Sequence, residues 1–165
     1  MKRSGFLRRN VGLKRKSSLR IEGVSDTADL KKEIQALVRD IVIKRDGGCI
    51  LRDVTTGIPP CNGYAKDSHL ILQADHLITR SNSATYADTR LIVCVCKGHH
   101  GWKSVGSNLR KAQYDALVRT ILPPDRVALW DRCEADSWRP TRTGASDWKL
   151  AIVALKQELA SYEQA

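Results

Sequence analysis

The sequence has no run of about 18 apolar residues, the length that a helix needs to cross a membrane. Its basic beginning also lacks the apolar stretch that a secretory signal requires. We therefore expect a soluble, intracellular protein. The five cysteines are odd in number, which disfavours a framework of disulfides. In a reducing compartment they are more readily metal ligands or buried thiols.

Acidic residues are missing from residues 1–20, although the chain of 165 residues has a net charge of +10. We predict that residues 1–25 form a basic, flexible arm, because such a segment cannot bury enough apolar surface to offset the entropy of ordering it. DNA is the expected partner of the arm, and a solubility tail or an address label is the alternative. The basic residues of the arm are Lys2, Arg3, Arg8, Arg9, Lys14, Arg15, Lys16 and Arg20.

Residues 26–165 are predicted to form a single, mainly helical domain of the α+β class. From Thr27 to Arg45 apolar residues recur every three or four positions, which indicates an amphipathic helix that ends before Gly47. Further helices are predicted over about 107–163. One of them ends before Pro123, one opens at Pro124, and one begins at Ser146 as N-cap. The tryptophans at 130, 138 and 148 are assigned to packing before base stacking.

Two short apolar runs, His69 to Ala74 and Leu91 to Val95, have the length and β-branched content of an antiparallel strand pair. Lys97 to Ser104 can form a short helix directly afterwards. The order strand, loop, strand and helix therefore defines a predicted core at about 68–105. Residues 49–67 are rich in Gly, Pro, Thr and Asp and form a long irregular loop, which usually needs a staple.

A structural zinc site is predicted from cysteine and histidine spacing. Cys96 and His99 have the spacing of a zinc knuckle, and Cys49 and Cys61 bracket the irregular loop as the natural second pair. Eleven residues separate this second pair, so the two thiols must converge through the loop. Cys94 is an alternative to Cys96 because alternate residues of a strand share a face. The alternative is that these cysteines are buried thiols that bind no metal.

A second site is predicted at the adjacent pair Asp75 and His76. An unpaired buried carboxylate is costly, so Asp75 is expected to face water or a cation, and its oxygens suit magnesium or manganese. A histidine side chain has an ordinary pKa of about 6.5, so His76 can accept a proton from water. His100 is expected to reach the same cation from the short helix. Arg80 is either a ligand of a phosphate oxygen or a solvated loop charge.

These residues predict hydrolysis of phosphodiester bonds. His76 removes a proton from the attacking water, and a cation held by Asp75 and His100 neutralises charge on the phosphate and on the leaving 3′ oxygen. The alternative is a zinc-stabilised DNA-binding accessory protein of recombination that does not cut. Such a module needs no open metal site, so the presence of Asp75, His76 and His100 favours the endonuclease over the binding module.

The motifs resemble those of the HNH, or His-Me finger, endonucleases, most closely the phage NinG/Rap-type recombination nucleases. The resemblance is strong over residues 73–103 and weaker in the basic arm, the helix before Cys49 and the C-terminal helix. It implies a ββα-metal core with a zinc-stapled loop, flanked by an N-terminal helix and C-terminal helices. It further implies structural zinc, catalytic magnesium or manganese, and a DNA endonuclease acting on branched or recombining DNA in the cytoplasm of a bacterial host cell, encoded by a phage or prophage. A homodimer is expected for a junction-cutting enzyme.

The resemblance also assigns roles to individual residues. His100, directly after the last zinc ligand, corresponds to a ligand of the catalytic metal, Asp75 to the other ligand and His76 to the general base. His99 replaces the second cysteine of the family knuckle, an exchange that zinc accepts.

The middle asparagine of the family motif, which orients the base, is missing. Its place falls on Leu91 or Arg90. Asn82 in the intervening loop is one substitute, and a backbone carbonyl is another.

Overall fold

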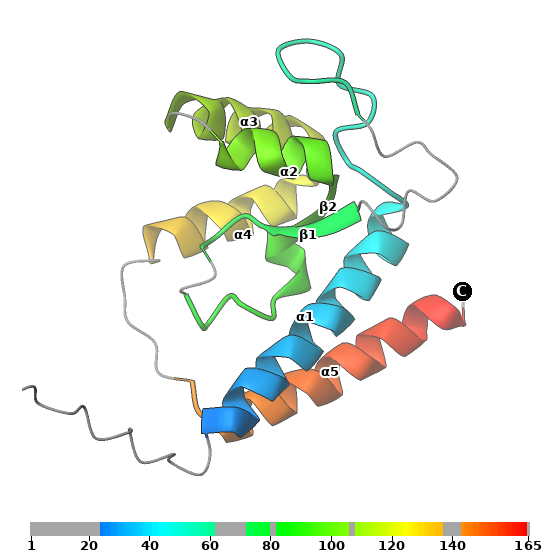
Figure 1. Cartoon of the computed structure of the whole chain (residues 1–165), viewed down its shortest axis with the longest axis vertical. Coiled ribbons are helices and arrows are strands. Elements are labelled where there is room, and N and C mark those ends of the chain that lie inside the picture. Colours follow the sequence, from blue (N-terminus) through cyan, green and yellow to red (C-terminus); the bar gives the residue numbers. More distant parts are fainter. Residues whose placement is uncertain (1–23, 62–71, 80–81, 106–107, 137–142, 165) are drawn as a thin grey trace, which may run out of the picture.

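The computed structural model describes residues 24–61, 72–79, 82–105, 108–136 and 143–164 (Figure 1). These residues form five α-helices, a short 3-10 helix and a two-stranded antiparallel sheet, which confirms a mainly helical α+β class. No helix among them has the length and apolar character needed to span a membrane. The elements in chain order are α1 (Val24–Asp46), β1 (Leu72–His76), η2 (Thr89–Leu91), β2 (Ile92–Cys96), α2 (Lys97–Ser104), α3 (Asn108–Ile121), α4 (Pro124–Ala135) and α5 (Ala145–Glu163).

Two helix boundaries differ from their predictions. α1 begins at Val24, so it includes the end of the predicted arm, whose other residues, with all eight of its basic side chains, lie outside the described part of the chain. The N-cap of α5 is Gly144, so the prediction of Ser146 was wrong. The reason is local, because the carboxylate of Asp147 accepts the backbone N–H of Gly144 at 2.8 Å and starts the helix earlier. The predicted bounds of α2 are confirmed.

The strand pair is present, and both described strands end later than predicted. In the antiparallel register Leu72 pairs with Cys96, and His76 pairs with Ile92. The predicted beginning of the first strand, residues 69–71, lies outside the described residues. β1 ends at His76, two residues after the predicted end at Ala74, so His76 belongs to the strand.

The core forms where α1 packs against the sheet on one side and against α5 on another. The stripe of Ile34, Val38 and Ile41 on α1 is at most 1 % exposed. Figure 1 shows α5 beside α1, with the sheet between α1 and the pair α2 and α3. Trp130 and Trp148 are buried, which confirms their packing role, whereas residue 138 lies outside the described residues.

The end of α1 is tied to β2 by a charged pair. Gly47 ends the helix in the left-handed region at φ 64°, where glycine has no steric penalty. Before it, Arg45 donates to the carbonyls of Thr89 at 2.7 Å and Ile92 at 2.8 Å. Asp46 binds Arg45 at 2.7 Å and accepts the backbone N–H of Cys94 at 2.8 Å. This network fixes where the chain leaves α1 toward Cys49.

We expect Arg45→Ala to lower the free energy of unfolding by about 2–4 kcal/mol, because it leaves a buried carboxylate without its charge partner. The side chain of Asp46 is only 6 % exposed, and that of Arg45 is 19 % exposed. Arg52→Ala is the matched control, since Arg52 pairs with the next residue, Asp53, at the surface, with side-chain exposures of 50 % and 79 %. It should cost less than about 0.5 kcal/mol in the same urea titration. Equal losses in the two variants would contradict the structural role of Arg45.

Candidate functional site

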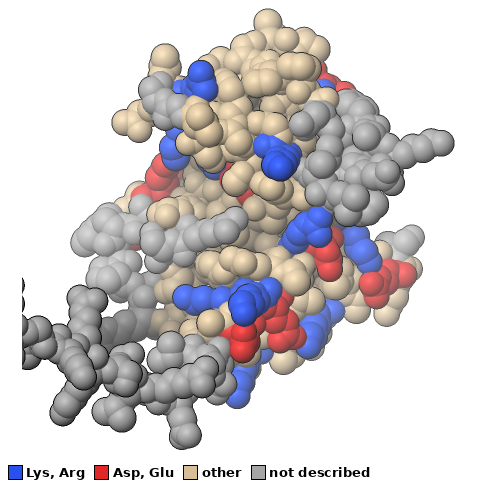
Figure 2. All heavy atoms as spheres, in the orientation of Figure 1, with Lys and Arg blue, Asp and Glu red and all other residues tan. Residues whose placement is uncertain are grey.

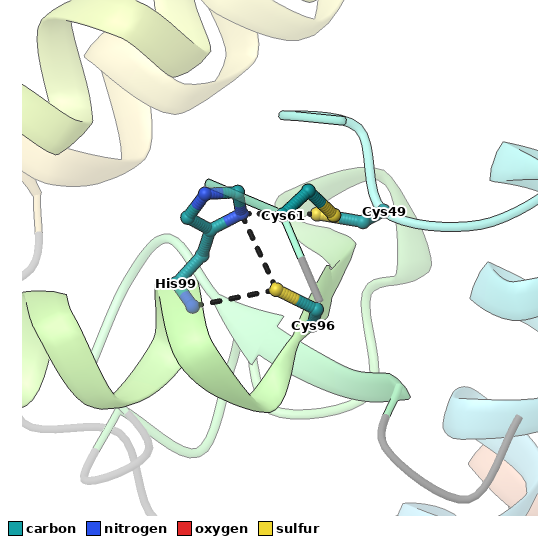
Figure 3. Close-up of side chains that lie close together, drawn as sticks. All are labelled: Cys49, Cys61, Cys96 and His99. Atoms are coloured by element: carbon teal, nitrogen blue, oxygen red, sulfur yellow. Dashed lines mark hydrogen bonds between the residues drawn. The ribbon is translucent and has the colours of Figure 1, made fainter. Parts of the chain in front are cut away.

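Cys49, Cys61, Cys96 and His99 come together in one cluster (Figure 3). One ligand atom from each residue lies within 4.8 Å of all the others. The Nδ1 atom of His99 is 3.2 Å from Sγ of Cys49 and 3.4 Å from Sγ of Cys96. Sulfur ligands about 2.3 Å from a tetrahedral zinc ion lie about 3.8 Å apart, so the cluster has the size and the donor set of a structural zinc site.

Three elements carry these ligands to one point. Cys49 follows the end of α1, and the next residue, Ile50, donates its backbone N–H to the carbonyl of Cys94 at 2.9 Å. Cys96 is both the last residue of β2 and the N-cap of α2, where its Sγ accepts the N–H of His99 at 3.4 Å. The predicted convergence of Cys49 and Cys61 through the loop is therefore present in the structure.

The other ring nitrogen of His99 has a fixed partner. Nε2 lies 2.9 Å from the carbonyl of Pro59, which can only accept, so the proton is on Nε2 and Nδ1 is free to bind metal. Burial, followed by the neighbouring thiols of Cys96 and Cys61, raises the pKa of the Cys49 thiol. A bound divalent cation reverses this preference by stabilising the thiolate.

The alternative ligand Cys94 does not belong to the cluster. It is fully buried, and burial raises the pKa of its thiol to about 12. Its backbone N–H is held by Asp46. Cys94 is thus a core residue, and the knuckle spacing of Cys96 identified the residue that joins His99.

Asp75 was expected to face water or a cation, and the structure excludes water. Asp75 is 4 % exposed, and its Oδ2 atom accepts from the hydroxyl of Tyr114 at 2.5 Å and from Nζ of Lys103 at 2.8 Å. Burial is tolerated because the charge is paired and hydrogen-bonded. Sequence reasoning missed both partners. Lys103 carried a weak signal, since it lies one helical turn after His100, whereas nothing in the sequence distinguished Tyr114 from a core residue.

The structure brings His100 to Asp75. Nε2 of His100 lies 3.6 Å from Oδ1 of Asp75, and the side chain of His100 is 32 % exposed. Two ligands that are each about 2.1 Å from an octahedral magnesium ion lie about 3 Å apart, so a small shift would let both atoms bind one ion. Among the described residues, no third Cys, His, Asp or Glu joins them as a metal-binding group. The remaining coordination positions would belong to water and substrate.

The ring of His76 lies apart from this pair. Its Nε2 atom is 3.1 Å from the carbonyl of Tyr86, and the two rings are 5.6 Å apart. Consecutive side chains of a strand point to opposite faces, which separates His76 from its neighbour Asp75. The backbone carbonyl expected as a substitute for the missing asparagine is thus present. Asn82 instead accepts the N–H of Ala84 at 3.1 Å within its own turn.

A groove of about 460 Å³ opens beside His76, between α1 and β1. Gln35 and Arg39 contribute to it from α1, and Gln73 contributes from β1. Arg80, the predicted phosphate ligand, lies outside the described residues. The groove therefore combines amide, guanidinium and imidazole groups at the strand that carries Asp75.

No protein-family model matches the chain, and neither the curated proteins nor the solved structures give a match. Functional assignment therefore depends on the geometry of the two clusters.

Proposed function

We propose that the chain is a divalent-metal-dependent DNA endonuclease with a ββα-metal (HNH) core. The observation that carries the proposal is the 3.6 Å approach of Asp75 Oδ1 and His100 Nε2. His100 directly follows His99, a member of the cysteine and histidine cluster, so one helical turn serves both groups. The succession of β1, β2 and α2 agrees with the strand, strand and helix order of such a core.

In this proposal Asp75 and His100 hold magnesium or manganese, which supplies charge neutralisation at the phosphate and the leaving oxygen when bound. His76 is the general base. Its Nε2 atom lies 3.1 Å from the Tyr86 carbonyl and its Nδ1 atom is buried, so the ring must turn before a nitrogen can accept the proton of the attacking water. The proposal therefore requires a substrate phosphate that reaches both faces of β1 at the end of the strand.

The groove on the His76 side supports DNA as the substrate. The guanidinium of Arg39 can contact a phosphate, and the amide of Gln35 can hydrogen-bond to base edges. The described residues carry as many acidic as basic side chains, and Figure 2 shows both signs interspersed in the lower part of one face. The excess charge of +10 therefore lies outside the described residues, largely in residues 1–20.

Deleting residues 1–20 is expected to weaken DNA binding at low salt and to flatten its salt dependence. Each phosphate that the arm no longer neutralises should reduce the slope of log affinity against log salt by about 0.9 on duplex DNA. Fluorescence anisotropy of a labelled duplex across a salt series measures this slope. Lys32→Ala, which removes one exposed charge from α1, is the control and should change the slope by about one phosphate at most. A parental slope in the deletion variant would reject the role of the arm.

The proposal is tested with zinc-loaded protein on plasmid, forked duplex and four-way junction DNA. Magnesium or manganese is added or omitted, rather than removed with a chelator, because a chelator would also strip zinc. We expect cleavage only with the added ion, and loss of cleavage in Asp75→Asn. Cleavage that is independent of the ion would overturn the proposed chemistry.

One observation favours a second candidate, a zinc-stabilised DNA-binding accessory protein of recombination. The charge of Asp75 is already compensated by Lys103, and the ring of His76 lies on the far side of the strand. Tight, metal-independent DNA binding without cleavage on all three substrates would select this candidate.

A further inference from the structure

We infer that Tyr114 is a positioning residue that fixes the Asp75 carboxylate so that Oδ1 is presented to the metal. The inference rests on the proposed function, because it concerns the same metal site. It extends that proposal to α3, an element outside the strand, strand and helix core.

The hydroxyl of Tyr114 is held rigidly at the carboxylate. Tyr114 is fully buried, as is Val118 one turn later on α3, and α3 packs against α2. The hydroxyl donates to Oδ2 of Asp75 at 2.5 Å. A side chain without exposed surface has little freedom to move, so the packing of α3 determines where Oδ2 is held.

Lys103 holds the same oxygen from α2. Its Nζ atom is 2.8 Å from Oδ2 of Asp75, 3.4 Å from the carbonyl of His76 and 4.7 Å from the ring centre of Tyr114. Each carboxylate oxygen has about two acceptor positions, so the two donors use those of Oδ2. Oδ1 is the oxygen that faces His100.

Tyr114 acts here as a neutral donor. A phenol has an ordinary pKa of about 10, so it is protonated around neutral pH and donates to the carboxylate without adding charge. Lys103, by contrast, places a positive charge next to the metal site, where it repels a dication.

This difference predicts opposite effects for two substitutions. Tyr114→Phe removes the donor, lets the carboxylate turn, and should weaken manganese binding about 10–100-fold, as is usual when a partner of a metal ligand is removed. Lys103→Met removes the repulsive charge but keeps the hydrogen bond from Tyr114, so manganese binding should become tighter. If Tyr114 only withdrew electron density from Asp75 and did not position it, Tyr114→Phe would bind manganese more tightly than the parent. A carboxylate with one hydrogen-bond donor fewer is a stronger ligand.

The experiment titrates manganese into zinc-loaded parent, Tyr114→Phe, Lys103→Met and the control Tyr162→Phe, and follows the free ion by electron paramagnetic resonance. Tyr162 lies on α5 and is 36 % exposed, so its variant should bind manganese as the parent does. Zinc content and the unfolding midpoint are measured on each sample. If the phenylalanine variant loses zinc or cooperative unfolding, Tyr114→Met, which also lacks the hydroxyl, replaces it.

Weaker binding in Tyr114→Phe with unchanged zinc content supports the inference. Unchanged or tighter binding overturns it, as does a parent that binds no manganese through Asp75. A parent that binds manganese but cuts no DNA defeats the proposed nuclease activity and leaves the positioning role standing. A parent that cuts, combined with a Tyr114→Phe variant of parental affinity, defeats only the positioning role.

Discussion

Cys96→Ser is expected to lose the bound zinc and the cooperative fold around it. The cluster joins the loop after α1 to β2 and α2, and three of its four members are buried. Structural zinc contributes an apparent binding free energy of about 10–16 kcal/mol in small zinc domains, which matches or exceeds the total stability of about 5–15 kcal/mol of a typical domain. Native mass spectrometry should show one zinc ion per parent chain and none in the variant, and circular dichroism should show an absent or broadened unfolding transition.

Cys94→Ala is the matched control for this prediction. Cys94 lies two residues earlier on the same strand and is equally buried, but it is outside the cluster. We expect this variant to keep one zinc ion and to lose only about 1–2 kcal/mol of stability, as for a small truncation in a core. Zinc retained by Cys96→Ser at parental stability, or lost by Cys94→Ala, would show that the ligand set is wrong.

His76→Ala is expected to lower the rate of DNA cleavage by about 10²–10⁴-fold, the usual contribution of a general base. Binding of DNA and manganese should persist, because Asp75, His100 and the arm are unchanged. Single-turnover cleavage of the preferred substrate, at saturating protein and metal, measures the chemical step directly.

His76→Gln separates chemistry from structure in this test. An amide can still donate to the carbonyl of Tyr86, as the imidazole does at 3.1 Å, but it cannot take up a proton. The glutamine variant should therefore unfold at the parental midpoint and cut as slowly as the alanine variant. Parental cleavage by either variant would remove His76 from the reaction.

Local patterns predicted the elements near the cysteine and histidine cluster well. The bounds of α2 follow from Cys96, which leaves the strand and caps the helix, and those bounds were correct. The strand ends were less accurate, since every residue of β2 is buried and a strand buried on both faces has no alternation to mark its limits. Cys49 was predicted as a ligand from spacing and chemistry alone.

The surroundings of Asp75 depend on interactions that no local pattern contains. Lys103 and Tyr114 are 28 and 39 residues away in the chain, on two further helices. Periodicity identifies which face of a helix is buried, but it does not identify the group that the face meets. Adjacency in the sequence suggested one site for Asp75 and His76. Because a strand sends neighbouring side chains to opposite faces, the two residues can act on one substrate only at the end of β1.

His99 and His100 occupy consecutive positions, one in the cysteine cluster and one beside Asp75. An insertion or deletion between them would break one of the two groups. We therefore expect the length of this turn of α2 to be the same in related proteins. Between Cys49 and Cys61, Ile50 and Pro59 are held by Cys94 and His99, but the exposed residues Thr55 and Thr56 are under no such restriction, because lengthening an irregular surface loop adds little to its closing entropy. We therefore expect homologous proteins to differ mostly in that loop, which is also the safest place for an engineered insertion.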